Sequence, residues 1–228
     1  NPMLRINDKM SIKNLNISEN EVEDSIVIVD SNTSIDNLVA NSNKSVGRGV
    51  ININSGKTLT VDHQEYSDNE ARFGGALYVA GTYINRDKGL SWSNNIATEK
   101  GGAIYIAEGG KINLSQANTF ITNQAAEGAA IYAEKLSSTD LVIPKAEFNN
   151  NAATSGGVIS FGGELELSDV KFTDTKQSAA FIDNINKNAT IDKAIISSIS
   201  FVRNATGGKG IALTNVRNGS KVENITGS

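Results

Sequence analysis

Cysteine is absent from this chain of 228 residues, and histidine occurs once. Without cysteine there are no disulfides, no thiolate metal sites and no cysteine nucleophile, although the redox compartment stays open. Apolar runs such as Ile26 to Val29 have the length of a strand, whereas a membrane-spanning helix needs roughly 18 apolar residues. The net charge of -4 argues against general nucleic-acid binding. We therefore expect no membrane insertion of this segment and no nucleic-acid partner.

Proline is also scarce, with 2 residues, whereas turn-forming residues are abundant. The chain has 28 Asn, 23 Ser and 21 Gly, about a third of all positions. These residues are poor helix formers, so the composition argues against a helix-rich enzyme. The chain opens with Asn1-Pro2-Met3 and has no basic and apolar leader. We expect it to be a segment of a longer protein.

Two short motifs recur along the chain in a fixed alternation. The first motif is a pair of small residues before an alternating apolar stretch: GGALYV from Gly74, GGAIYI from Gly101, GAAIYA from Gly128 and GGVISF from Gly156. These copies lie 27 or 28 residues apart. The second motif is an aromatic residue followed three positions later by Asn. Its copies end at Asn69, Asn95, Asn123, Asn151 and Asn204, with a decayed copy at Phe172.

The repeat predicts an all-β fold, a three-sheet parallel β-solenoid of about eight turns of 24 to 29 residues. In the repeat from Gly101 the three expected strands are Gly102 to Ile106, Lys111 to Leu114 and Asn118 to Ile121. Each is too short for a helix and alternates apolar with polar residues. Residues 1–37 are expected to form an irregular first turn or cap. Residues 38–228 are expected to form one continuous solenoid.

Most motif residues are interpreted as structural. The small pairs Gly74-Gly75, Gly101-Gly102, Gly128-Ala129 and Gly156-Gly157 suit a sharp bend with close backbone approach, and no helix pattern follows them as a phosphate cradle would require. Glycines at positions 56, 109 and 163 mark a further corner. Asn69, Asn95, Asn123, Asn151 and Asn204 are expected to tolerate left-handed backbone and to bond the equivalent amide on the next turn.

One aromatic column is predicted on the outer surface. Tyr78, Tyr105 and Tyr132 follow each other at intervals of 27 residues, at the strand position that alternation turns outward. The column has two interpretations. It is either a sugar-binding stripe or a ladder that stabilises neighbouring parallel strands.

No constellation of catalytic or metal-binding residues stands out. His63, the one histidine, lies in the polar run Asp62-His63-Gln64-Glu65 and is interpreted as a solvated side chain. Glycoside hydrolysis needs two facing carboxylates, yet Asp68 aligns with Asn94, Thr122 and Asn150 rather than with other acids. Glu164 and Glu166 are interpreted as a solvated edge, and the calcium-binding nonapeptide repeat is absent. We therefore expect no enzymatic activity, no metal and no cofactor.

The alternation of GGA-Ile/Leu with aromatic-x-x-Asn resembles the repeats of the chlamydial polymorphic membrane proteins, which are autotransporter adhesins. The resemblance covers about residues 38 to 213. It implies a right-handed parallel β-helix passenger that is exported, then displayed at the outer membrane or secreted. Its implied partner is a receptor or glycan on host or neighbouring cells. The chain departs from the family in lacking cysteine and in its decayed copies at Gly128 and Phe172.

Two functions follow from the sequence. The first is a surface adhesin segment that binds through an extended lateral face. The alternative is a polysaccharide-binding or polysaccharide-degrading β-helix of the lyase or tailspike type. The polar insertion from Glu134 to Thr139 replaces the usual glycine corner and is a second candidate contact surface.

Overall fold

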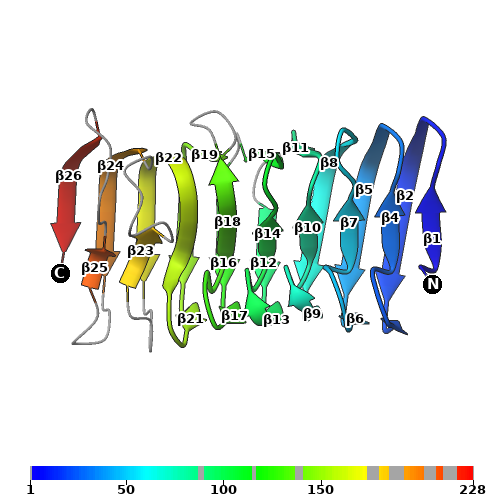
Figure 1. Ribbon diagram of the computed structural model, residues 1–228, viewed down its shortest axis with the longest axis horizontal. Helices are drawn as coiled ribbons and strands as arrows, with labels where there is room; N and C mark the ends of the chain where they lie inside the picture. Colours follow the sequence, from blue (N-terminus) through cyan, green and yellow to red (C-terminus); the bar gives the residue numbers. More distant parts are fainter. Residues whose placement is uncertain are drawn as a thin grey trace.

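The computed structural model shows an all-β rod in which parallel strands stack as a solenoid (Figure 1). It describes residues 2–86, 90–114, 117–136, 141–173, 180–184, 193–202, 209–212 and 220–227. No helix occurs within these ranges. The two ends of the chain lie at opposite ends of the rod's long axis (Figure 1). The predicted all-β solenoid is thus confirmed, but with about 6 turns that carry described strands on all three sides instead of the eight expected.

The first side of the rod, which we call face A, is built from the strand that follows each small pair. Its members are β1 (Leu4–Ile6), β4 (Val27–Val29), β7 (Ile51–Ile53), β10 (Leu77–Val79), β14 (Ile104–Ile106), β18 (Ile131–Leu136), the first part of β22 (Gly157–Thr173), β23 (Ala180–Asn184) and β25 (Lys209–Ala212). Every neighbouring pair is parallel, and the register is constant except for a shift after Ala133 where β18 pairs with β22. Equivalent repeat positions therefore lie directly above one another.

The second side, face B, is the longest. It contains β2 (Met10–Ser18), β5 (Thr33–Asn41), β8 (Thr58–Ser67), β11 (Thr82–Asn85), β12 (Leu90–Ser93), β15 (Lys111–Asn113), β16 (Asn118–Ile121), β19 (Leu141–Ile143), β20 (Ala146–Asn149), the rest of β22, β24 (Lys193–Val202) and β26 (Lys221–Gly227). The unbroken strand β8 pairs with both β11 and β12. The two apolar stretches that the sequence assigned to separate sheets therefore belong to one face, which corrects the prediction.

The third side, face C, is made by short strands that the sequence pattern did not mark. They are β3 (Glu21–Val22), β6 (Lys44–Ser45), β9 (Glu70–Phe73), β13 (Ile96–Lys100), β17 (Gln124–Ala125) and β21 (Ala152–Ala153). Their inward side chains are small, including Ala71, Ala97, Ala125 and Ala153. Small inner residues give almost no apolar signal, and this explains why face C escaped the sequence pattern.

The core consists of columns of identical or similar side chains. Tyr66, Trp92, Phe120, Phe148 and Phe172 stack along the rod with ring centroids 4.7 to 5.7 Å apart, and all are fully buried. Aliphatic columns from faces A and B complete the interior. The predicted apolar columns are confirmed, because a repeat of constant length in parallel register returns each inward residue to the same place.

The bend between faces B and C depends on a residue with left-handed backbone. It is the residue just before each column asparagine: Glu19, Ser42, Asp68, Asn94, Thr122 and Asn150 have φ between 53 and 58°. The sequence had assigned this conformation to the asparagine itself, and that was wrong. Because the preceding residue makes the bend, the column asparagine is free to turn inward.

Candidate binding face

The predicted asparagine ladder forms inside the bend between faces B and C. Each Oδ1 accepts two hydrogen bonds from the turn before it, one from the backbone N–H and one from Nδ2 of the equivalent asparagine. For Asn123 as acceptor these measure 3.0 and 3.1 Å from Asn95. The Nδ2 groups of Asn69, Asn95, Asn123 and Asn151 also donate to a backbone carbonyl on the preceding turn, as Asn123 does to Trp92 at 2.8 Å. The ladder amides are thus used within the protein.

The ladder extends further toward the N-terminus than the sequence indicated. Asn69 accepts from Asn43, which in turn accepts from Asn20. The sequence pattern did not mark Asn43, because Ala40 stands where the other copies have an aromatic residue. The register pairs Ala40 with Tyr66, so Asn43 is the true equivalent. Asn204 lies outside the described residues.

The small pairs lie where face C meets face A. Gly74, Gly101 and Gly128 have φ of 66, 69 and 63°. A Cβ on Gly102 would come within 2.0 Å of the carbonyl oxygen of Ala129 on the next turn. Gly156, unlike its three equivalents, is not in the left-handed region, and the N–H of Gly157 donates to Ser160 Oγ at 3.0 Å. The pairs therefore allow adjacent turns to approach closely, as expected.

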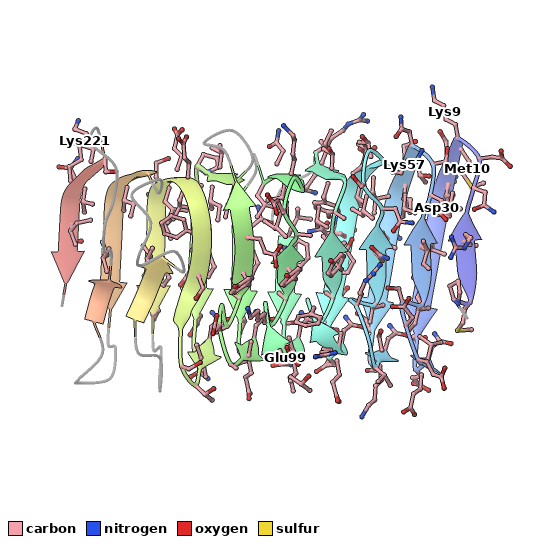
Figure 2. All side chains as sticks on the ribbon, viewed as in Figure 1. Lys9, Met10, Asp30, Lys57, Glu99 and Lys221 are labelled. Atoms are coloured by element: carbon pink, nitrogen blue, oxygen red, sulfur yellow. The ribbon has the colours of Figure 1, made fainter. Side chains whose placement is uncertain are left out.

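The three tyrosines of face A form a stack in register. The Tyr78 and Tyr105 rings lie 5.0 Å apart at 14°, and the Tyr105 and Tyr132 rings lie 5.4 Å apart at 6°. The same column holds Asn52 before Tyr78 and Ser160 after Tyr132. The stack lies on β10, β14 and β18, near the middle of the rod (Figure 1), and Figure 2 shows Glu99 at the lower edge of the same region.

The stack is less accessible than the sequence indicated. Tyr105 and Tyr132 are buried, with 7 and 4% of their surface exposed, and Tyr78 is half-buried. Their rings point outward from the sheet, but face-to-face stacking and neighbouring side chains cover them. The description of the tyrosines as an exposed stripe is therefore wrong for two of the three.

The side chains that cover the stack come from the position just before each small pair. Arg48 lies over the Tyr78 ring at 5.3 Å, Phe73 packs against Tyr105 at 5.3 Å, and Lys100 lies over Tyr132 at 4.5 Å. Arg48, Phe73 and Lys100 are themselves neighbours in one column. Sequence reasoning missed this flanking column, although its constant place before the glycines was a usable signal.

Two of the three tyrosine hydroxyls form hydrogen bonds with charged side chains. The Tyr105 hydroxyl donates to Glu134 Oε1, and Lys100 Nζ donates to the Tyr132 hydroxyl at 3.0 Å. Burial, together with the bond to Glu134, raises the pKa of Tyr105. Burial also raises the pKa of Tyr78 and of Tyr132, although a nearby cation opposes it at each. In the core, burial raises the pKa of Tyr66 and Tyr83 as well.

The pKa of all five tyrosines of the chain is therefore raised above its ordinary value near 10 while the protein is folded. A raised pKa favours the neutral phenol in the folded state, so its contribution to stability is complete below pH 10 and is lost as the pH rises further. Absorbance at alkaline pH should show tyrosinate appearing together with loss of the strand signal in circular dichroism. Gradual ionisation near pH 10 with an intact fold would contradict this expectation.

The residues weighed for catalysis are not brought together. His63 is exposed on β8, and Asp68 belongs to a column with Asn94 and Thr122. Glu164 and Glu166 lie on β22, one partly and one fully exposed. Within the described ranges no group of three or more His, Asp and Glu side chains is placed to hold a metal ion. The described residues also contain no helix that is long and apolar enough to cross a membrane.

A family model for the Chlamydia polymorphic membrane protein repeat matches residues 93–107. The matched segment runs from the end of β12 through the ladder residue Asn95 and β13 to the glycine pair and β14. It thus contains both bends around face C and the central tyrosine of the stack. No match was found among curated proteins or among solved structures.

Proposed function

We propose that this chain is a segment of a bacterial surface adhesin of the autotransporter-passenger type, which attaches to a receptor or glycan on host or neighbouring cells. The observation that carries the proposal is the match to the Chlamydia polymorphic membrane protein repeat. It falls on the residues that make both bends of a solenoid turn. A family of this name implies display at the cell surface or outer membrane.

The architecture supports a binding role. The repeat motifs account for the inward columns and the bends, and they leave the outward positions of faces A and B free to vary. Parallel strands at a spacing of about 4.8 Å make each wall flat and rigid along the rod. Such a wall presents side chains to a partner with little loss of conformational entropy on binding. We propose that the segment binds and does not catalyse.

The proposal is tested by measuring attachment of the labelled chain to cultured epithelial cells, beside a screen for degradation of polysaccharides. Saturable attachment that unlabelled chain competes away, without any turnover, is the expected result. Absence of attachment would overturn the adhesin function. Turnover that is abolished in the Glu164→Gln or Glu166→Gln variant would instead establish the polysaccharide-degrading alternative.

A further inference from the structure

The end of the tyrosine stack nearest the N-terminus differs from the rest of it. Tyr105 lies between two tyrosine rings, and the hydroxyls of both Tyr105 and Tyr132 have a charged hydrogen-bond partner. Tyr78 has a tyrosine ring on one side only, because the next residue in its column is Asn52. Its hydroxyl bonds to none of the described residues, and the side chain is half-buried. The stack therefore ends in a partly open ring.

Arg48 supplies a cation at this open end. Its guanidinium lies over the Tyr78 ring at 5.3 Å and is exposed to solvent. Where the structure describes the chain, no carboxylate forms an ion pair with it, in contrast to Arg72, which pairs with Glu99 at 2.6 Å. A guanidinium held over an aromatic face keeps its outer donors available for a planar anion. The ring thus positions Arg48 for a ligand carboxylate.

Asn52 supplies an acceptor beside the cation. Asn52 pairs with Tyr78 across the strands of face A. Its chain neighbours Ile51 and Ile53 point into the core, so the Asn52 side chain points outward. Only 1% of Asn52 is exposed, and its Oδ1 has no hydrogen-bond partner. A buried acceptor without a donor is destabilising, so it is rarely retained without a role. Oδ1 is covered in the unliganded structure, so a ligand hydroxyl reaches it once the side chains over it move aside.

We propose that Arg48, Asn52 and Tyr78 form a subsite for an acidic saccharide, a sugar that carries a carboxylate beside hydroxyl groups. This inference rests on the adhesin function proposed above and names the class of its ligand. The carboxylate binds the Arg48 fork, a neighbouring hydroxyl donates to Asn52 Oδ1, and the sugar lies against the free edge and hydroxyl of Tyr78. Adjacent strands lie about 4.8 Å apart, close to the width of one sugar ring.

The chemistry favours a sugar over an acidic peptide. A uronic or sialic acid presents a carboxylate and several hydroxyls on one rigid ring, so a single residue reaches all three side chains. An acidic peptide side chain offers only the carboxylate to Arg48. Uronate and sialate share the recognised groups, and the experiment separates them.

The test measures binding of trigalacturonate and of sialyllactose to the whole chain, with neutral trigalactose and a tetraglutamate peptide as comparison ligands. One acidic sugar is expected to bind, and the neutral sugar and the peptide at least tenfold more weakly. Arg48→Ala and Asn52→Leu should each weaken acidic-sugar binding about tenfold or more. Arg48→Lys should bind the acidic sugar with an affinity between those of the parent chain and Arg48→Ala, because an ammonium keeps the charge but not the planar fork.

Arg86→Ala is the matched control. Arg86 is also exposed and carries the same charge, but it lies beyond β11 on face B and pairs with Asp62. An equal loss of binding in this variant, or equal binding of tetraglutamate, would overturn the subsite. Cell attachment measured in parallel separates the two proposals. Attachment by the parent chain that Arg48→Ala and Asn52→Leu leave intact would refute the subsite and spare the adhesin function, whereas no attachment by the parent chain would refute the adhesin.

Discussion

Phe120→Ala is expected to lower the free energy of unfolding by roughly 3–5 kcal/mol. The Phe120 ring is fully buried between Trp92 at 5.7 Å and Phe148 at 4.7 Å, nearly parallel to both. Its removal loses the transfer free energy of the ring, two stacked contacts and the space it fills. The neighbouring backbone is held by ladders on both sides, so the cavity cannot collapse easily.

The measurement is denaturant unfolding followed by circular dichroism and by fluorescence of Trp92, the one tryptophan of the chain. Because Trp92 stacks on Phe120, its emission reports the cavity directly. Phe73→Ala is the control, since Phe73 is half-buried outside the core. We expect it to cost less than half as much. An unchanged unfolding midpoint for Phe120→Ala would place that ring outside the core.

Asn123→Leu is expected to destabilise the protein by about 3–5 kcal/mol, although leucine has the same number of side-chain heavy atoms and is apolar. The change removes the acceptor for the backbone N–H and Nδ2 of Asn95 and the donor to the Trp92 carbonyl. These groups lie in the buried ladder, and each orphaned group costs about 1–3 kcal/mol. Burying more apolar surface does not compensate for them.

The control is Asn113→Leu, the same chemical change at an exposed position on β15. It should alter the free energy of unfolding by no more than about 0.5 kcal/mol. Both variants are compared with the parent chain by denaturant unfolding at neutral pH. Equal stability of the two variants would show that the ladder contributes little to the fold.

The sequence indicated the repeat and its inward columns correctly because these depend on local rules. Alternation decides which side chains of a strand point inward, and a constant repeat length in parallel register stacks Phe120 on Phe148 and Asn95 on Asn123. Where the repeat is irregular, the same rules failed. Asn43 was not identified from the sequence because Ala40 replaces the aromatic residue that marks the motif.

The candidate site was only partly visible in the sequence. The periodic tyrosines were found, but their burial, the flanking column of Arg48, Phe73 and Lys100, and the bond from Tyr105 to Glu134 were not. Each depends on how side chains from different turns meet across a bend. The equivalent positions of neighbouring turns do not carry asparagine, so the place of Asn52 beside Tyr78 follows only from the strand register.

The sequence by itself determined that this protein is an all-β solenoid, which residues of faces A and B line its core and where the glycine bends fall. These properties follow from composition, alternation and repeat length. The tertiary structure alone decided that two apolar stretches share face B, that small residues build face C, and that the residue before each ladder asparagine makes the bend. The physical reason is that strand pairing and backbone bends depend on contacts between residues about 27 positions apart, which no local pattern records.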